Sequence, residues 1–252
     1  MRVVSYNIHK GIGGRDRLYR FERIMAVIEH LHPDLVCLQE VDHNVRRSRF
    51  DHQPKLLGER LNAAAVVYQH NVQLKMGGYG NLILSGWPLV AKHQISLRMN
   101  SKKPRGAQAV VVDTPQGPLH LVNWHLGLSE RERSWQVNHL LTHSLFREGG
   151  ELPTLIIGDY NDWRNQLKNQ SFAEHGFEQI TSPPSRFRSF PAYLPLGSLD
   201  KAYYRGGLKI ERAFIAHSAL ARRASDHLPL VVDFEILYQG PPRELRIHHD
   251  AP

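Results

Sequence analysis

Short apolar runs that each end at a polar residue recur along this chain. Residues 34–39 and 155–157 are apolar runs that lead to Glu40 and, past Gly158, to Asp159, whereas residues 2–6 and 119–124 alternate and end at Asn7 and His125. Apolar runs of this length, bounded by turn residues, are typical of buried strands. We therefore predict strands whose carboxyl ends present polar side chains, which is where ligands bind in many α/β folds.

Between these runs, the spacing of apolar residues predicts helices and further strands. Helical spacing over residues 18–31 and a shorter stretch at 56–61 predict two helices. A capping box at residues 129–132 predicts a third helix, which extends to about residue 148. We expect a helix or loop over 163–175, irregular structure over 181–197, and a glycine-rich turn at 77–80. The remaining predicted strands cover about residues 63–68, 81–85, 89–98, 106–113, 198–204, 208–216 and 230–234.

Eight polar residues at or beside predicted strand ends are candidates for chemistry. They are Asn7, Glu40, His125, Asp159, Asn161, Asp200, Asp226 and His227. Carboxylate oxygens suit Mg²⁺, whereas the compact spacings of zinc sites, the serine nucleophile elbow and the phosphate-binding lysine loop are absent from the sequence. Two plainer interpretations stay open: an Asx-rich turn at Asp159–Asp162 that caps the next helix, and an exposed strand end at Glu40. Hydrolysis of a phosphoester by activated water uses most of these residues.

Length and cysteine content indicate one domain in a reducing compartment. The 252 residues are 41% hydrophobic, which is enough for one core over residues 1–238. We expect residues 239–252, with three prolines and paired histidines, to form a flexible tail. Cys37 is the single cysteine, so we expect an inert buried thiol and no internal disulfide. Because no signal peptide or membrane-spanning run is visible, we predict a cytoplasmic protein.

The charge favours a polyanionic partner. The formal net charge is +8, and basic residues cluster at 46–49, 102–105, 186–188 and 222–223. Nucleic acid, with DNA ahead of RNA, is the favoured partner, and an anionic phospholipid surface is the alternative. A basic surface that only aids solubility is the third interpretation.

Seven short blocks, in order along nearly the whole chain, resemble the endonuclease/exonuclease/phosphatase superfamily with its DNase I-like fold. They are Ser5-Tyr6-Asn7, Leu38-Gln39-Glu40-Val41, Gly80-Asn81-Leu82-Ile83-Leu84-Ser85, Trp124-His125, Gly158-Asp159-Tyr160-Asn161-Asp162, Leu199-Asp200-Lys201 and Ser225-Asp226-His227-Leu228-Pro229. The resemblance implies a four-layered αββα sandwich, in which two mixed β-sheets pack together and are flanked by helices. It also implies a Mg²⁺- or Mn²⁺-dependent phosphodiesterase.

By this resemblance, Glu40 binds the metal with Asn7 and Asp226 nearby, and Asp159 orients or deprotonates the attacking water. The remaining residues that it implicates stabilise charge, transfer a proton or position a neighbour; they are His125, Asn161, Asp200 and His227. The resemblance does not settle which histidine is the base.

Two further residues are candidates for binding substrate. Asn81 supports the site from behind or only shapes a turn. Arg105 binds phosphate or belongs to a solvated basic loop. Each pair of alternatives stays open.

The blocks also narrow the substrate. The segment 197–201 lacks the cysteine-containing block that inositol polyphosphate 5-phosphatases carry. Abasic-site endonucleases usually have an acidic residue two positions after the first Asn, whereas this chain has His9 at that position. A DNase I-like nuclease is therefore the first hypothesis, and a phospholipid or other small-molecule phosphodiesterase or phosphatase is the second. The second would be favoured by an exposed apolar hairpin; the one candidate, 87–90, is expected in the core. A binding module without catalysis is the third.

Overall fold

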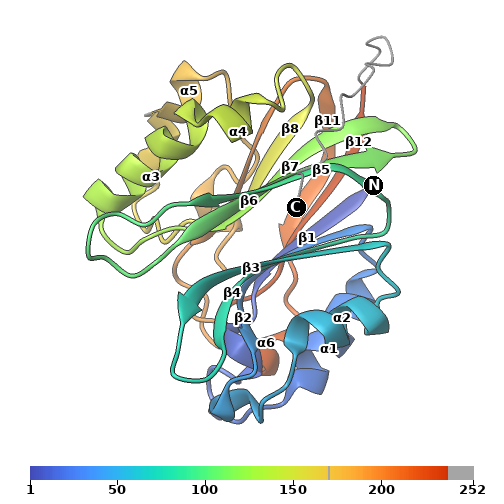
Figure 1. Cartoon of the computed structure of the whole chain (residues 1–252), viewed down its shortest axis with the longest axis vertical. Coiled ribbons are helices and arrows are strands. Elements are labelled where there is room, and N and C mark those ends of the chain that lie inside the picture. The colour runs from blue at the N-terminus through green and yellow to red at the C-terminus, as the bar shows by residue number, and fades with distance from the viewer. Residues whose placement is uncertain (170, 238–252) are drawn as a thin grey trace, which may run out of the picture.

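The computed structural model describes residues 1–169 and 171–237, so the predicted tail at 239–252 lies outside the described residues. Two six-stranded mixed sheets face each other, with helices on both outer surfaces. Figure 1 shows this order of layers: helices, sheet, sheet, helices. The four-layered αββα sandwich that the sequence predicted is confirmed.

The first sheet holds the amino-terminal strands and the last two strands of the chain. Its strands, in spatial order, are β11 (Leu208–Ile215), β12 (Leu230–Ile236), β1 (Arg2–Asn7), β2 (Leu35–His43), β4 (Gly78–Ser85) and β3 (Ala65–Gln73). Strands β1 and β2 are parallel, and the other neighbours in this sheet are antiparallel. The outer face carries α1 (Phe21–Leu31), α2 (Gln53–Arg60) and α6 (Ala221–Ala224).

The second sheet is built from the middle of the chain. Its strands, in spatial order, are β5 (Leu89–Ser96), β6 (Gly106–Thr114), β7 (Gly117–His125), β8 (Thr154–Asp159), β10 (Asp200–Arg205) and β9 (Glu178–Gln179). Here β7 and β8 form the parallel pair. The outer face carries α3 (Glu130–Thr142), α4 (Ser144–Arg147) and α5 (Ser171–Glu174). Short 3₁₀ turns are η1 (His9–Gly11), η2 (Arg46–Ser48), η3 (Gln166–Asn169) and η4 (Pro184–Arg186).

The apolar run in β8 contributes to two separate hydrophobic clusters. Leu155 and Ile157 join the cluster that includes the space between the sheets, whereas Ile156 joins the cluster beneath α3 and α5. Both faces of this strand are therefore buried, which explains why its sequence is continuously apolar rather than alternating. Cys37 is buried as predicted, and burial raises the pKa of its thiol.

Three predicted elements differ from the structure. Strand β2 does not end at Glu40 but continues to His43 through a bulge. The predicted glycine turn at 77–80 is wrong, because Gly78–Gly80 begin β4 and pair with both neighbouring strands. The helix predicted to run to residue 148 breaks at His143, whose extended backbone ends α3 and whose ring accepts from the Leu145 N–H.

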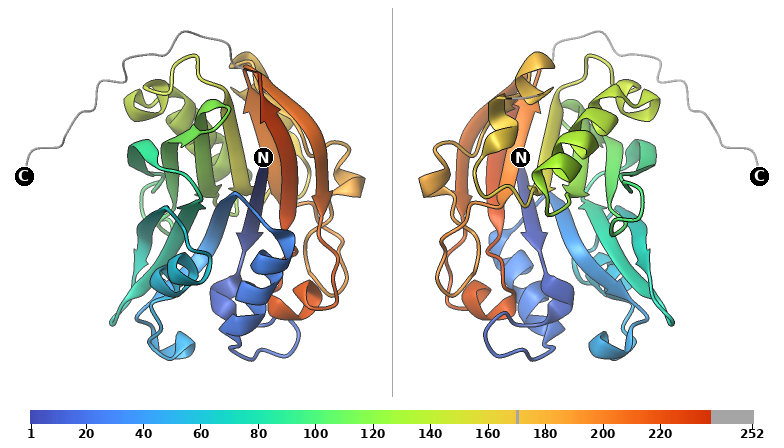
Figure 2. Two further views of the ribbon diagram at one scale, coloured as in Figure 1. Left: turned by 90° about the vertical axis from the view of Figure 1, so that its right-hand side faces the viewer. Right: turned by 90° about the vertical axis from the view of Figure 1, so that its left-hand side faces the viewer.

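The two parallel pairs determine where polar strand ends meet. In the first sheet Asn7 is in register with Gln39, and in the second sheet His125 is in register with Asp159. Strand β10 adds Asp200 opposite Asp159. Figure 2 shows β1 pointing towards the end of the sandwich at which α1 and α6 lie. None of the helices in the described part of the chain combines the length and apolar character that crossing a bilayer requires.

Candidate active site

Asn7 and Asp159 join the two sheets at this end of the sandwich. The Asn7 side-chain amide donates to Asp159 Oδ2 at 3.0 Å, and both residues are buried.

Gly158 permits the approach of β8 to β7, because its φ is +152° and a Cβ there would lie 2.2 Å from the Trp124 carbonyl oxygen. A side chain at this position would push Asp159 away from its partners.

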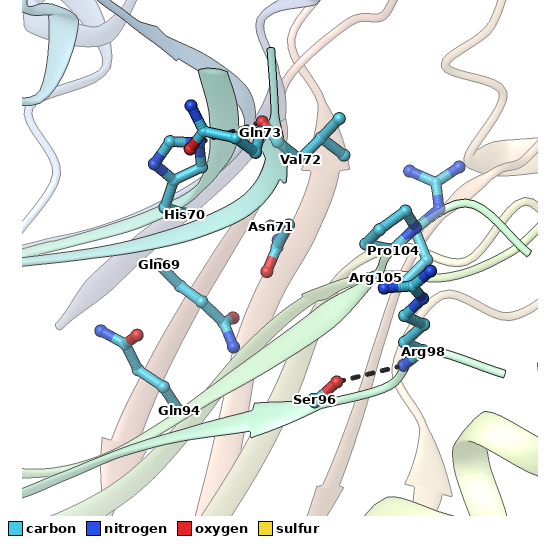
Figure 3. A pocket seen from close by; sticks show the side chains of 10 residues that line it. All are labelled: Gln69, His70, Asn71, Val72, Gln73, Gln94, Ser96, Arg98, Pro104 and Arg105. Carbon is cyan, nitrogen blue, oxygen red and sulfur yellow. Dashed lines mark hydrogen bonds between the residues drawn. The ribbon is translucent and has the colours of Figure 1, made fainter. Parts of the chain in front are cut away.

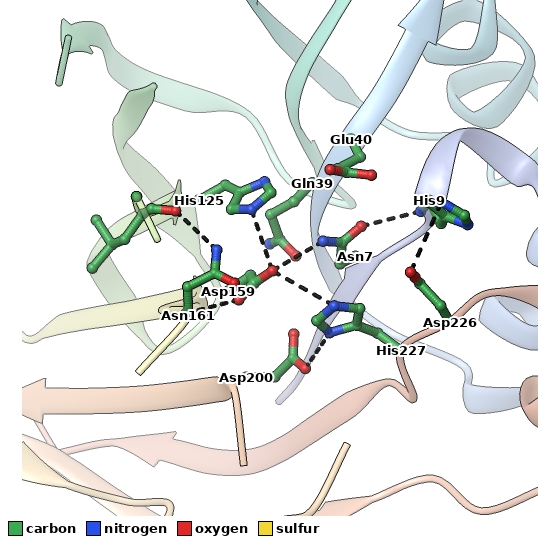
Figure 4. A network of polar contacts seen from close by, with 12 residues as sticks. Asn7, His9, Gln39, Glu40, His125, Asp159, Asn161, Asp200, Asp226 and His227 are labelled. Atoms are coloured by element: carbon green, nitrogen blue, oxygen red, sulfur yellow. Dashed lines mark hydrogen bonds and ion pairs between the residues drawn. The ribbon is translucent and has the colours of Figure 1, made fainter. Parts of the chain in front are cut away.

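Asp159 is the centre of a buried polar network (Figure 4). Its Oδ2 atom lies 3.3 Å from His125 Nε2 and 3.7 Å from His227 Nε2. The second nitrogen of the His227 ring, Nδ1, is held by Asp200, whose Oδ2 atom lies 2.8 Å away. One carboxylate therefore meets two imidazoles, and a second carboxylate orients one of them.

The segment 225–227 is tied to the end of β1. The Ser225 hydroxyl donates to the Asn7 carbonyl oxygen at 2.7 Å, and it accepts from the His227 N–H at 3.3 Å. The backbone that carries His227 therefore follows the end of the first sheet, whereas Asp159 belongs to the second. The geometry of the imidazole–carboxylate contact depends on how the two sheets are joined.

The charges in this network are strongly perturbed. Burial raises the pKa of Asp159 to about 6, against the influence of His227. Burial alone would lower the pKa of His227, but Asp200 and Asp159 together raise it to about 10. Burial and the nearby Arg105 guanidinium lower the pKa of His125 well below its usual range. At neutral pH the site therefore holds an imidazolium at His227 and a neutral imidazole at His125.

Asn161 completes the turn after β8. Its backbone N–H donates to Asp159 Oδ1 at 2.9 Å, and its side-chain amide donates to the Leu126 carbonyl oxygen at 2.9 Å. Its backbone is left-handed, with φ +50°. The Asx turn that the sequence left as an alternative is thus present, and it fixes the Asp159 carboxylate within the network.

Glu40 lies in a strained position that directs its carboxylate toward this end of the sandwich. It has φ +58° at the bulge in β2, and its side chain is 13% exposed. The Lys10 ammonium contacts the carboxylate, and although burial opposes ionisation, Lys10 lowers the pKa of Glu40. Non-glycine residues in this backbone region cost free energy and occur at functional sites more often than elsewhere.

The donors near Glu40 fit a magnesium ion that keeps several waters. The Glu40 carboxylate is the kind of ligand that Mg²⁺ takes, with Asn7 in the adjacent strand as a neutral oxygen donor, and the Lys10 ammonium on the same carboxylate competes with the ion. Asp226 is directed to His9, at 3.8 Å between Oδ2 and Nε2, rather than to Glu40 (Figure 4). The described residues contain no cluster of three or more acidic, histidine or cysteine side chains arranged around one ion position. The metal roles of Asn7, Glu40 and Asp226 stay predictions.

Asn81 and Arg105 both lie in the interior rather than in solvated loops. The Asn81 amide donates across to the Gly106 carbonyl oxygen at 2.9 Å, so it links β4 to β6. Arg105 is 7% exposed, and its Nε atom has no hydrogen-bond partner among the described residues. Both line a narrow cleft together with Glu40 and His125. Their roles in binding substrate stay predictions.

Sequence reasoning missed the polar residues that hold the site from behind. Gln39 and Asn123 are fully buried between the sheets and hydrogen-bonded to each other. Lys201 is also buried, and its ammonium contacts the carboxylate and carbonyl oxygens of Asp162, the residue after Asn161. Polar residues inside otherwise apolar strands were the available signal, since each needs a buried partner.

The sequence pattern of the Endonuclease/Exonuclease/phosphatase family matches residues 4–227. The chain belongs to this family. The match includes all ten candidate residues, from Asn7 to His227. The resemblance stated from the short blocks is confirmed, and with it the general class of phosphoester hydrolases.

Similar proteins agree with this assignment over nearly the whole chain. The uncharacterized protein YbhP of Escherichia coli K12 is 28% identical over 249 residues, which cover 93% of this chain and 96% of that protein. An endonuclease/exonuclease/phosphatase of Beutenbergia cavernae superposes with a TM-score of 0.79 at 22% identity, covering 94% of this chain and 71% of that one. A mannosyl-6-phosphatase of Bacteroides thetaiotaomicron gives 0.71 at 18% identity, covering 93% and 99%. The structural likenesses concern the fold.

Proposed function

We propose that this protein is a Mg²⁺- or Mn²⁺-dependent hydrolase of phosphodiesters that uses an activated water. The observation that carries the proposal is the contact of one buried carboxylate, Asp159, with the two imidazoles of His125 and His227. A carboxylate with its pKa raised to about 6 is poised to accept a proton near neutral pH. A fixed imidazolium nearby is suited to stabilise negative charge that develops on a phosphate.

The roles of the side chains follow from these charge states. Asp159 takes the proton of the attacking water, and His227, held by Asp200, stabilises the charge on the phosphoryl oxygens. His125 is neutral and Asn161 is held in the turn, so both offer hydrogen bonds to the phosphate without adding charge. A bound divalent ion, held by Glu40 with Asn7, would polarise a phosphoryl oxygen.

A substrate panel tests the proposed reaction. Plasmid DNA, single-stranded DNA, RNA, a chromogenic phosphodiester and phospholipid vesicles are each incubated with Mg²⁺ or Mn²⁺, and product is quantified against an Asp159→Asn control. We expect hydrolysis of at least one phosphodiester, with the variant much slower. The absence of turnover on the whole panel would contradict the proposal.

Nucleic acid is the first substrate class. The net charge of +8 and exposed arginines such as Arg186 and Arg188 support electrostatic binding to phosphates. Such binding weakens steeply as the salt concentration rises. Binding releases the counterions condensed on the nucleic acid, and their release gains less free energy when the surrounding solution already contains much salt. DNA is placed ahead of RNA on the resemblance to DNase I-like enzymes.

Phospholipid is the second substrate class, and one observation favours it. Residues 190–197 form a tight hairpin that contains no charged residue, closed by a bridge between Phe190 and Gly197. At its tip, Tyr193, Leu194 and Leu196 are 53%, 58% and 61% exposed. Sequence analysis expected no exposed apolar hairpin beside the site, and these residues were expected only to be irregular.

The hairpin rests directly on the catalytic network. The Phe190 ring lies 4.8 Å from the His227 ring, and the exposed Trp163 ring packs edge-on against Phe190 at 5.8 Å. Arg164 follows Trp163 and is exposed. Leucines at a tip with aromatic rings and arginines behind them suit the boundary between acyl chains and anionic headgroups. The exposed rings of Tyr193 and Trp163 are faces on which a base can stack, so the two leucines are the feature of this hairpin that favours lipid.

A further inference from the structure

A second polar pocket adjoins the catalytic cleft. It has a volume of about 560 Å³ and lies between the ends of β3 and β5 and the loop that precedes β6. Figure 3 shows the side chains that line it. Its polar lining residues include Gln69, Asn71, Gln94, Ser96, Arg98 and Arg105.

The backbone of β3 directs Asn71 into this pocket. Asn71 lies at a bulge, where the pairing of β3 with β4 shifts between His70 and Val72. Bulges near active sites re-aim a side chain that a regular strand would place elsewhere. Gly106 leaves space for this arrangement, since a Cβ there would lie 2.4 Å from Asn71 Oδ1 and 2.6 Å from the Gln69 amide.

Two buried polar atoms in the pocket wall have no partner among the described residues. Gln69 is 6% exposed, its Nε2 donates to the Ile95 carbonyl oxygen, and its Oε1 accepts nothing. Arg105 is 7% exposed and its Nε donates to nothing. Both atoms are covered by the surrounding protein, so they make this wall polar without being directly accessible from the pocket.

The pocket and the catalytic cleft share part of their walls. Asn71 and Arg105 line both, and the cleft is also lined by Glu40 and His125. The charge of Arg105 also contributes to the lowered pKa of His125. A phosphate held between Arg105 and His125 would therefore place one of its ester groups in the amide-lined pocket.

We propose that this pocket binds a hydroxyl-rich, non-aromatic alcohol group, such as a glycerol, inositol or sugar moiety, esterified to the scissile phosphate. Side-chain amides and guanidinium groups donate to and accept from several neighbouring hydroxyls at once. Among the described residues that line the pocket, the one aromatic ring is that of His70 and most of the others are amides, hydroxyls or guanidinium groups, so the lining suits hydroxyls better than the face of a nucleobase. This inference rests on the proposed phosphodiester hydrolysis and specifies the class of substrate.

Matched chromogenic diesters test the pocket. The para-nitrophenyl phosphodiesters of glycerol, ethanol and thymidine share one leaving group and differ only in the second alcohol. We expect wild-type kcat/KM to favour the glyceryl over the ethyl ester by about tenfold, the discrimination that one or two hydrogen bonds supply. Asn71→Leu and Arg98→Gln should each move that ratio towards one. Arg98 is exposed, so its variant reports on the pocket even if Asn71→Leu fails to fold. Arg147→Gln, at an exposed arginine of α4, should keep the wild-type ratio.

The outcomes separate the pocket from the reaction. A glyceryl-to-ethyl ratio near one in the wild type, or a ratio that neither pocket variant changes, would overturn the inference while leaving hydrolysis intact. A preference for the thymidyl ester that Asn71→Leu abolishes would assign the pocket to a nucleoside and overturn it too. If no ester is hydrolysed, the proposed function fails. Calorimetric titration with the glyceryl ester then tests the pocket by itself, and the absence of binding would overturn the inference. Comparing the hydrolysis of phosphatidylglycerol vesicles with that of glycerophosphoglycerol shows whether the alcohol group belongs to a lipid headgroup or to a soluble ester.

Discussion

The side-chain amide of Gln39 donates to Asn123 Oδ1 at 2.8 Å across the interior of the sandwich. Neither residue is exposed to solvent, and they belong to different sheets. Asn123 in turn donates to the Leu38 and Leu82 carbonyl oxygens of the first sheet. Gln39 precedes Glu40 by one residue, and Asn123 precedes His125 by two. This polar link therefore fixes the spacing of the two sheets next to the candidate site.

Removing the Asn123 side chain should destabilise the fold. Asn123→Ala removes one of three contacts of the Gln39 amide, which keeps Ser5 and Cys37, and takes the side-chain donor away from the Leu38 and Leu82 carbonyl oxygens. A cost of about 1–3 kcal/mol is typical where a buried hydrogen bond is lost in this way. Urea unfolding measures the loss. The exposed amide variant Asn100→Gly, at a position with φ +50° that glycine adopts readily, is the matched control, and surface changes of this kind usually cost less than about 0.5 kcal/mol. Equal losses in the two variants would contradict the role of the Gln39–Asn123 link.

The strand-end residues were predictable because they follow from backbone periodicity. An apolar run buried on both faces must end where polar residues begin, and parallel strands bring their carboxyl ends to one edge. Asn7, His125 and Asp159 met as that rule requires. Glu40 departed from it, because the bulge in β2 depends on pairing with β4, which local sequence does not encode.

Burial of polar residues and exposure of apolar ones were the features that sequence left open. Arg105 belongs to a basic cluster that looks solvated in the sequence, yet its guanidinium group lies in the wall of the cleft. Leu194 and Leu196 fall in a segment that the sequence predicts only to be irregular, and they lie exposed at the tip of the hairpin. In each case tertiary packing decides, since the same residue types occur in both environments.

Asp159→Asn and His227→Ala should each lower kcat by about a hundredfold or more, with substrate affinity nearly unchanged. The expected size is that of losing one acid, base or charge-stabilising group. Single-turnover rates measure the chemical step, and direct titration measures binding on the best substrate of the panel. Asp113→Asn and His217→Ala, at exposed positions, are the matched controls. If both site variants kept the wild-type kcat, the catalytic roles would be wrong while the fold stood.

Chelation should abolish activity, and Glu40 should account for the metal requirement. Calorimetric titration with Mn²⁺ reads out binding without catalysis: we expect a saturable signal in the wild type and its loss in Glu40→Gln. The Lys10 ammonium contacts the same carboxylate, so Lys10→Met should strengthen Mn²⁺ binding by removing the competing cation. Glu59→Gln, at an exposed glutamate, should bind as the wild type does. Unchanged binding in Glu40→Gln would refute the assignment.

His120 should make the fold sensitive to acid. Burial lowers the pKa of this imidazole to about 3, and the ring lies 3.3 Å from the Thr154 hydroxyl. Between pH 6.5 and about 3 the unfolded chain binds a proton that the folded chain does not, so stability falls as pH falls through this window. From pH 7 to pH 5 this amounts to about 2 kcal/mol. Urea unfolding at both pH values should show a loss about 2 kcal/mol smaller in His120→Gln than in the wild type, because the other buried groups, His125 among them, contribute to both proteins. Parallel pH dependence in the two proteins would contradict this prediction.

The hairpin at 190–197 should bind an anionic bilayer. The Leu194→Ser and Leu196→Ser double variant removes the apolar tip without touching the Phe190–His227 contact or the arginines. Because each leucine is more than half exposed, burying both in lipid is worth about 2–3 kcal/mol, and the double variant should bind phosphatidylglycerol vesicles roughly 30- to 100-fold more weakly. Met76→Ser, at an apolar side chain that is 57% exposed in another loop, should bind as the wild type does. Sedimentation with vesicles of phosphatidylglycerol and of phosphatidylcholine separates the apolar contribution from the charge contribution. If the double variant kept vesicle binding and instead lost affinity for single-stranded DNA, the hairpin would be a nucleic-acid surface, and the phospholipid class would lose the observation that favours it.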